Sequence, residues 1–238
     1  MTDREIALAY YPVLHRDEAE PIPLRAVGYT VMAYTQPSRS FPGRTVSVPE
    51  DCACTVEYAF YYDYDIEHMN DLEHVWVTVG KDGSIRDAQG SFHGKYLNLL
   101  VPALPGYLPP ENGHVHAYVQ PGKHAMLAAP CMVGLFPNWE GCCRRAGGPV
   151  LIGNPFGAAH SPTGKDLFVP AQADNRNSIR YLRDVLSFEP SLRFRREEAP
   201  AQDMLMTWDE LFARIPAWVS AECERLGKLY EEGEHHGL

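Results

Sequence analysis

Acidic residues and histidines gather in the segment EHMNDLEHVWVTV, which covers residues 67–79. Residues 74–79 have the composition of a β-strand. Because side chains alternate between the two faces of a strand, Asp71 and Glu73 extend the same face as Val75 and the valines beyond it. Burying an ionised carboxylate without a partner costs several kcal/mol. A basic partner, backbone amides or a metal ion must therefore compensate the two acids.

The residues just before this segment add acid rather than base. Asp63 and Asp65 precede Glu67, and His68 lies close by, whereas the nearest basic residues in sequence have no evident place beside them: Lys81, Arg86 and Lys95. Carboxylates gathered this closely repel one another, and a divalent cation relieves that repulsion. The spacing therefore favours a metal site.

A simpler interpretation of the same acids stays open. Asp71 follows Asn70, and residues of this kind are common at turns because they form local hydrogen bonds. Asp63 and Asp65 would then be solvated residues at the end of a hairpin. In that case only Glu73 needs a partner, and no metal is required.

A second group of candidate residues lies in GHVHAYVQPGKHAML. His114 and His116 share one strand face, and Pro121-Gly122 predicts a turn. A two-residue turn would place His124 on the face opposite His116, whereas a bulge or a longer loop would reverse this. The sequence leaves open whether these imidazoles converge. His93 lies in GSFHGK, a loop flanked by glycines that is suited to exposing its side chain to a pocket.

Composition limits the partners and the location of the protein. The 238 residues carry a formal charge of −10, which repels phosphate backbones and anionic headgroups, so neither nucleic acid nor a membrane surface is a favoured partner. The sequence has no apolar run long enough to span a bilayer, and its first residues are charged where a secretory signal would be apolar. These features predict a cytoplasmic protein without membrane insertion.

The cysteines allow one further metal site. In a cytosol reduced thiols are the default, and free thiols are the simpler interpretation. The alternative is a tetrathiolate zinc site, although the spacings differ from the usual C-x₂-C pairs. Its four ligands would be Cys52, Cys54, Cys142 and Cys143.

The elements that would position these residues are mostly strands. Short runs rich in β-branched and aromatic residues alternate with turns rich in Gly, Pro, Asn and Asp. They predict strands at 26–35, 54–65, 74–79, 114–119 and 148–153. Strands so short, joined by turns rather than by helical crossovers, favour a mainly β fold, an antiparallel two-sheet β-sandwich over residues 1–170.

The C-terminal part changes to a helical period. Ile179, Leu182 and Leu186 have helical spacing, with Asn177 or Ser178 as the cap. A capping box over residues 207–210 begins a second helical segment. We expect Pro216 to break or kink that segment, with a further helix from 216 to about 230. The sequence thus predicts one domain over 1–238, in which a helical extension at 175–238 packs on the sandwich.

Several of these motifs together resemble a known family. The segments EYAFYYDYD, DLEH, SFHGK and HAYVQPGKHAML, with the opening AYYPVLHRDEAEPIP, resemble in order the landmarks of Vps62-like proteins. More remotely they resemble the necrosis- and ethylene-inducing peptide 1-like (NPP1) proteins. The resemblance covers residues 9–127 and implies a β-sandwich with a divalent cation at one end.

The resemblance also implies roles for single residues. Asp71 and Glu73 match the two acids of the family signature, and His68 matches the histidine three positions before them. Asp63 or Asp65 matches an acid near the end of the aromatic strand, and the later histidines of the family match His93 and His124. Leu72 stands where the signature has Trp, so a cytolytic activity on plant membranes is not implied.

Together these features predict a metal-dependent enzyme of hydrolase type that acts on a small-molecule or glycan ligand. The metal would activate water or substrate, and His93 and His124 are the candidate catalytic acid or base. The candidate metal ligands are Asp63, Asp65, His68, Asp71, Glu73 and His116. Ligation by oxygen alone would favour Ca²⁺ or Mg²⁺, and histidine ligation Zn²⁺, Mn²⁺ or Fe²⁺. The alternative is a non-catalytic module in which the metal stabilises loops that bind a glycan, a lipid headgroup or a protein.

Overall fold

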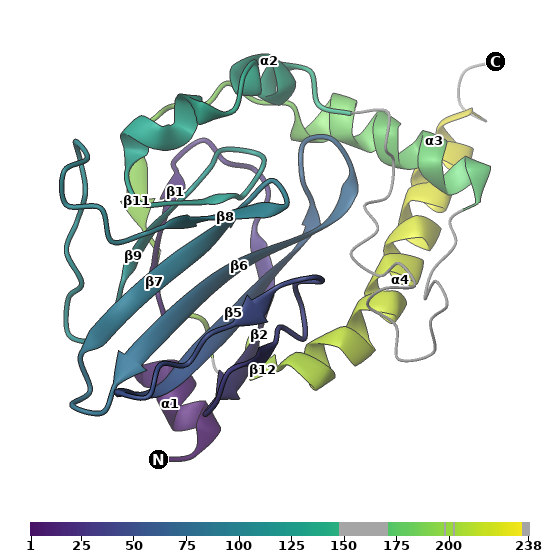
Figure 1. The fold of residues 1–238 in the computed structure, drawn as a ribbon. Helices are drawn as coiled ribbons and strands as arrows, with labels where there is room; N and C mark the ends of the chain where they lie inside the picture. Colours follow the sequence, from purple (N-terminus) through teal and green to yellow (C-terminus); the bar gives the residue numbers. More distant parts are fainter. Residues whose placement is uncertain (148–170, 198, 202, 235–238) are drawn as a thin grey trace.

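Two β-sheets packed face to face form the body of the protein (Figure 1). The computed structural model describes residues 1–147, 171–197, 199–201 and 203–234. The larger sheet has the order β12-β2-β5-β6-β7-β8. Its strands are β2 (Leu24–Met32), β5 (Cys52–Tyr64), β6 (Met69–Gly80), β7 (Ile85–Phe92), β8 (Lys95–Asn98) and β12 (Leu205–Thr207).

The smaller sheet joins segments that are far apart in the chain. Its order is β10-β9-β1-β11, and its strands are β1 (Val13–Asp17), β9 (His116–Val119), β10 (Met126–Leu127) and β11 (Phe194–Arg196). Leu14 and Ala117 from this sheet share one buried cluster with Val75 and Val77 of the larger sheet. The core therefore lies between the two sheets, and the valine row of β6 belongs to it.

A two-stranded hairpin, β3 (Gln36–Pro37) with β4 (Thr45–Val46), makes up a third, small sheet. Val46 of this hairpin packs with Met32 and Trp76 in a second hydrophobic cluster, separate from the main core. Trp76 alternates along β6 with the core-facing valines, so this cluster lies on the outer face of the larger sheet.

The expected mainly β, two-sheet architecture with C-terminal helices is confirmed, with one difference in strand direction. Most pairings are antiparallel, but β1 pairs with β9 and β12 with β2 in parallel. Parallel neighbours cannot be joined by a tight turn, and both of these pairs bring together segments distant in sequence. The expected strand at 148–153 lies outside the described residues.

The helices are α1 (Asp3–Ala9), η1 (Pro130–Leu135), α2 (Trp139–Arg144), α3 (Gln172–Tyr181), η2 (Leu182–Leu186) and α4 (Trp208–Glu234). The prediction of a cap at Asn177 or Ser178 was wrong, because α3 begins earlier, where the Asp174 side chain accepts from the backbone N–H of Ala171 at 2.8 Å. The capping box was right: Thr207 and Glu210 exchange hydrogen bonds between side chain and backbone.

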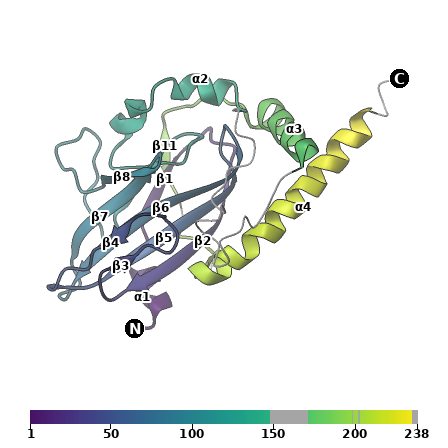
Figure 2. The ribbon, with the colours of Figure 1, turned by 45° about the vertical axis from the view of Figure 1, so that its right-hand side comes forward.

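The expected break at Pro216 was also wrong, because α4 continues through it. Leu211, Ile215 and Val219 are buried along one side of the helix on both sides of the proline. Packing of this stripe offsets the missing N–H of a proline inside a helix. Figure 2 shows α4 running beside the sheets, with α3 against its C-terminal half. Over the described residues, no helix combines the length and apolar character needed to cross a membrane.

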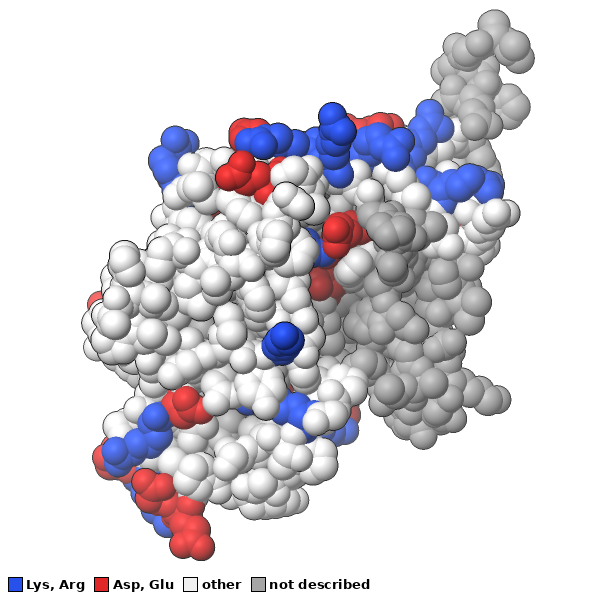
Figure 3. All heavy atoms as spheres, turned by 45° about the horizontal axis from the view of Figure 1, so that its top comes forward, with Lys and Arg blue, Asp and Glu red and all other residues white. Residues whose placement is uncertain are grey.

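The end of the molecule that carries α2 and α3 is highly charged. Figure 3 shows Lys and Arg side chains gathered along this edge, with acidic side chains among them. Arg144, for example, bonds Glu189 at 2.5 Å and Glu140 at 3.2 Å. Exposed pairs of this kind contribute little to stability, so this edge is a solvated surface.

Candidate functional site

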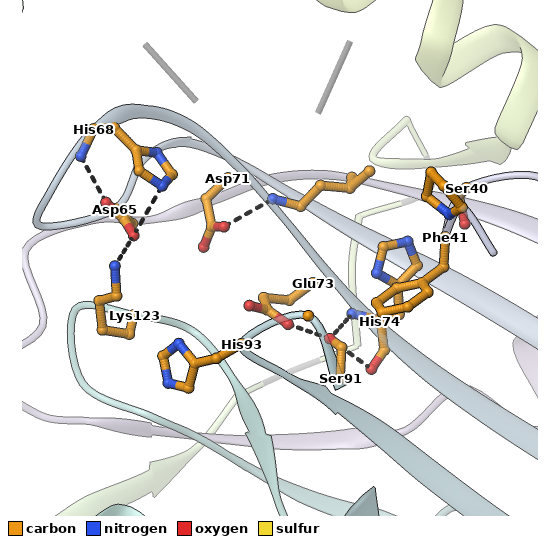
Figure 4. A pocket seen from close by; sticks show the side chains of 13 residues that line it. Ser40, Phe41, Asp65, His68, Asp71, Glu73, His74, Ser91, His93 and Lys123 are labelled. Carbon is orange, nitrogen blue, oxygen red and sulfur yellow. Dashed lines mark hydrogen bonds and ion pairs between the residues drawn. The ribbon is translucent and has the colours of Figure 1, made fainter. Parts of the chain in front are cut away.

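A cavity of about 400 Å³ opens where β6 begins, next to the β5–β6 turn (Figure 4). We call it the acidic cavity. Its wall combines the turn, two strands and two loops distant in sequence, through Ser40, Phe41, Pro42, Asp65, His68, Asp71, Leu72, Glu73, His74, Ser91, His93, Gly94 and Lys123. The segment that suggested a site in the sequence thus lies at a real opening.

The β5–β6 turn holds His68 in one orientation. Asp65 Oδ1 accepts from the backbone N–H groups of Glu67 and His68, at 2.6 and 2.7 Å. His68 Nδ1 lies 2.9 Å from the carbonyl oxygen of Asn70. Because a carbonyl only accepts, Nδ1 carries the proton of the neutral ring and Nε2 keeps its lone pair. This nitrogen lies 3.4 Å from Asp65 Oδ2.

Lys123 is the basic partner that the sequence did not reveal. Its Nζ lies 2.5 Å from Asp65 Oδ2 (Figure 4) and 2.6 Å from Glu67 Oε2. Burial opposes the charge of Lys123, but the two carboxylates outweigh it and raise its pKa. Lys123 follows the turn after β9, far along the chain from the acids, and its place beside His124 was the only signal for it.

Asp71 is ionised and held by a buried histidine. His124 Nδ1 lies 2.8 Å from Asp71 Oδ2, and the His124 ring is fully buried, stacked on Tyr62 at 3.8 Å between centroids. Burial opposes ionisation of Asp71, but the hydrogen bond and the charges of His124, His68 and Lys123 lower its pKa. His124 orients an acid of the site and does not line the cavity, so it is a positioning residue rather than a candidate catalyst.

Glu73 differs from Asp71, although both lie on the same face of β6. Its carboxyl is buried and accepts a hydrogen bond from the Ser91 hydroxyl. Burial, and then the negative charge of Asp71, raise the pKa of Glu73 well above its ordinary value. Two neighbouring carboxyl groups with pKa values driven apart are a frequent arrangement for proton transfer.

His93 presents a basic nitrogen to the same cavity. Its Nε2 lies 2.9 Å from Gln120 Oε1, an amide oxygen that accepts, so the neutral ring keeps a lone pair on Nδ1. The ring stacks on Phe136 at 4.3 Å between centroids, and burial lowers its pKa.

Two of the expected ligands lie elsewhere. Asp63 bonds Arg25 at 2.6 Å and does not line the acidic cavity. His116 lies at the start of β9, with its Nδ1 2.8 Å from His15 Nε2. The loop after β9 is longer than a two-residue turn, because Val119 pairs with Met126 rather than with His124. His116 and His124 therefore contact different partners.

The described residues contain no group of three or more His, Cys, Asp or Glu already placed to hold a metal ion. Each acid of the cavity instead has its own partner. The cysteines do not converge either. Cys52 and Cys54 lie at the start of β5, whereas Cys142 bonds Glu67, beyond the far end of that strand, and Cys143 bonds the carbonyl of Pro121. The tetrathiolate interpretation was wrong.

No protein-family model matches the chain, and no curated protein matches it. A solved structure that matches is the crystal structure of a triple mutant of NLPPya, an NPP1-type protein, at 15% sequence identity and a TM-score of 0.33. The match covers 63% of this chain and 82% of that chain. Values this low carry no inference about the site, so the resemblance to the Vps62-like and NPP1 families stays a prediction.

Proposed function

We propose that the acidic cavity binds a divalent cation and, beside it, a small polar ligand such as a glycan, and that the protein is a metal-dependent enzyme of hydrolase type. The observation that supports this most directly is the pair Asp71 and Glu73, a partly buried and a buried carboxyl group that line one open cavity. Asp71 has a basic partner, whereas burial and the charge of Asp71 raise the pKa of Glu73 and favour its protonated form. A bound cation can neutralise Glu73 in place of that proton.

The donor chemistry of the wall suits such an ion. Asp65, Asp71 and Glu73 supply carboxylate oxygens, which hard cations prefer, and His68 supplies Nε2 with its tautomer already fixed by the Asn70 carbonyl. Ligation by His68 would favour Mn²⁺ or Zn²⁺, and its absence Mg²⁺ or Ca²⁺. Binding requires Lys123 to release Asp65 and Glu73 to lose its proton.

The residues around the ion would then have separate roles. When bound, the cation supplies Lewis-acid polarisation of the ligand or of water. His93, with a lone pair on Nδ1, accepts a proton at the cavity wall. His124 keeps Asp71 ionised and fixed, and Ser91 orients Glu73. Phe41 contributes an aromatic surface to the ligand side.

A non-catalytic binding module is the second candidate, and the burial of His124 favours it. One of the two histidines expected to act in catalysis is 0% exposed and cannot reach a ligand. The cavity is left with fewer groups that can transfer protons, as a binding site would be. Both candidate functions require the cation, so cation binding is tested first and the enzyme is then distinguished from the binding module.

Calorimetry on the metal-stripped full chain tests the cation. We expect stoichiometric binding of Mg²⁺, Ca²⁺, Mn²⁺ or Zn²⁺, with proton release measured in buffers of different ionisation heat. Glu73→Gln and Asp71→Asn should weaken binding about tenfold or more, equal to about 1.4 kcal/mol. Lys123→Met should strengthen it, because the competing ammonium is gone. Asp63→Asn is the matched control outside the cavity.

Absence of binding at millimolar concentration for every ion, or equal loss in Asp63→Asn, would refute the cation site. The enzyme is distinguished from the module by His93→Ala. If hydrolysis of a glycoside or ester panel is lost while cation affinity is kept, the protein is an enzyme. If wild type turns over no member of the panel but binds a glycan only with cation present, it is a module.

A further inference from the structure

The second hydrophobic cluster, on the outer face of the larger sheet, encloses a charged side chain. Arg44 directly precedes β4 in the β3–β4 hairpin and is 9% exposed. Its Cζ is 3.6 Å from the ring centroid of Trp76 and 3.8 Å from that of Tyr96. Both rings therefore contact the guanidinium at cation–π distance, and their planes meet at 66°.

Most N–H donors of this guanidinium have no partner. Nη2 donates to Gln89 Oε1 at 2.5 Å, but Nε and Nη1 are shielded from solvent without a hydrogen-bond partner among the described residues. The nearby buried acid, Glu57, forms no hydrogen bond with Arg44. The Glu57 carboxylate accepts instead from Ser40 at 2.8 Å, from Trp76 Nε1 at 2.7 Å and from Ser38. Leaving buried donors of a charged group unsatisfied is costly, so an occupant that accepts from them is expected.

Arg44 borders a separate cavity of about 210 Å³, which we call the arginine cavity. It lies between the hairpin and strands β5 to β8, and its other lining residues are Thr45, Val46, Ser47, Thr55, Trp76, Thr78, Asp87, Gln89 and Tyr96. None of these residues lines the acidic cavity. Tyr96, 49% exposed on the edge strand β8, forms an outer wall of this cavity.

Two hydroxyl groups of this cavity, those of Thr55 and Thr78, can only accept. Thr55 Oγ1 donates to the carbonyl of Ser47 at 3.0 Å, so in the 2.9 Å contact between the two threonines Thr78 must be the donor. Both threonine protons are therefore used, and Thr78 Oγ1 keeps a free lone pair. The Asp87 carboxylate adds a second acceptor, held by Gln89 Nε2 at 2.9 Å.

We propose that the arginine cavity binds a sugar acid or a similar hydroxylated carboxylate. The ligand carboxylate accepts from Arg44, its hydroxyl groups donate to Thr78 and Asp87, and its C–H face packs on the ring of Tyr96. A carboxylate without hydroxyl groups leaves Asp87 facing an anion, and a neutral sugar leaves Arg44 unsatisfied. The pairing of one cation with fixed acceptors thus selects a ligand that carries both kinds of group. This proposal is independent of the cation in the acidic cavity.

The alternative role for Arg44 is structural, as an anchor for the β3–β4 hairpin. Both roles predict that Arg44→Gln lowers the melting temperature. Only the ligand role predicts saturable binding. Thr78→Val keeps the size of the side chain and leaves Arg44 in place, so it should weaken binding only if the cavity holds a ligand.

The test is a titration of the full chain with D-glucuronate, followed by NMR chemical shifts or calorimetry, with D-glucose and acetate as matched controls. We expect saturable binding of glucuronate, at least about tenfold weaker binding of either control, and at least about tenfold loss in Arg44→Gln. Thr78→Val should weaken glucuronate binding by about threefold to tenfold, with a smaller drop in melting temperature than Arg44→Gln, because it removes one buried hydrogen bond to Thr55.

Several results would overturn the proposal: no saturable glucuronate binding by wild type, equal binding by Arg44→Gln, or acetate binding as tightly as glucuronate. A loss in Glu73→Gln equal to that in Arg44→Gln would also overturn it, because the ligand would then occupy the acidic cavity. If Arg44→Gln fails to fold, the Thr78→Val result decides, and unchanged affinity there counts against the proposal.

Discussion

His124 Nδ1 lies 2.8 Å from Asp71 Oδ2, and this contact joins the turn after β9 to the start of β6. His124 has a φ of 56°, in the left-handed region, and is completely buried. A histidine in that conformation is unusual and is kept by its surroundings. The ionised state of one cavity acid therefore depends on a side chain that no ligand can touch.

His124→Asn should lower the free energy of unfolding by about 2 kcal/mol. Asn tolerates the left-handed backbone, so the loss reports the charge-assisted hydrogen bond and the stacking on Tyr62 rather than strain. Urea denaturation at pH 7 measures it. The matched control is His93→Asn, also at positive φ (48°) and stacked, but bonded to a neutral amide. A cost as large in His93→Asn would contradict the importance of the Asp71 contact.

Glu73→Gln should flatten the dependence of stability on pH. The pKa of Glu73 is raised in the folded state, so its contribution is fully present below the unfolded value of about 4.3 and is lost as pH rises through the folded pKa. Gln mimics the protonated form at every pH. Wild type should lose up to about 1.4 kcal/mol per pH unit relative to Glu73→Gln across that window. Denaturation from pH 4 to 8 measures this, and parallel profiles would contradict it.

Pro216→Ala should stabilise the protein by about 1–2 kcal/mol. Alanine restores a backbone N–H inside α4 and removes the ring from the helix interior, and greater freedom of the unfolded chain offsets part of this gain. Urea midpoints compare it with Ala217→Gly, the exposed neighbour, which should destabilise by about 1 kcal/mol. A loss of stability in Pro216→Ala would mean that the proline ring itself packs productively.

Gly90→Ala should destabilise by about 2 kcal/mol or more. A Cβ there would lie 2.6 Å from Met126 Cβ and 2.7 Å from the Met126 carbonyl oxygen, where β7 of the larger sheet packs against β10 of the smaller one. The backbone atom cannot move without shifting β10. Gly141→Ala on α2, where nothing lies within 4 Å, is the control and should stabilise slightly. Equal thermal shifts for the two variants would contradict this close contact.

Local patterns in the sequence located several elements, because such patterns depend on neighbouring residues. Runs of β-branched and aromatic residues located β5 and β6, and Thr207 with Glu210 located the start of α4. The same logic failed at Pro216, where a buried stripe on both sides of the proline overrides its local preference. The parallel pairings β1–β9 and β12–β2 left no mark in sequence, because they depend on how distant segments meet.

The candidate site was predicted in part for the same reason. Asp65, His68, Asp71 and Glu73 lie close in the chain and do share one cavity. Lys123 could not be found, because its partnership with Asp65 depends on a loop whose length the sequence left open. The alternation of side chains along a strand could not decide whether His116 and His124 lie on the same face, because that depends on which residue pairs with Val119. Asp63 and Asp65, two residues apart, took different partners at the end of β5.

The position of β1 between β9 and β11 has a consequence for how the protein is made. β1 leaves the ribosome well before both of its neighbours, residues 116–119 and 194–196. Its edges therefore stay unpaired until those residues are made, and contacts of such long range form slowly. Lys123 and His124 come shortly after β9 in the chain. The carboxylates of Asp65 and Asp71 therefore lack these basic partners until the second sheet has formed.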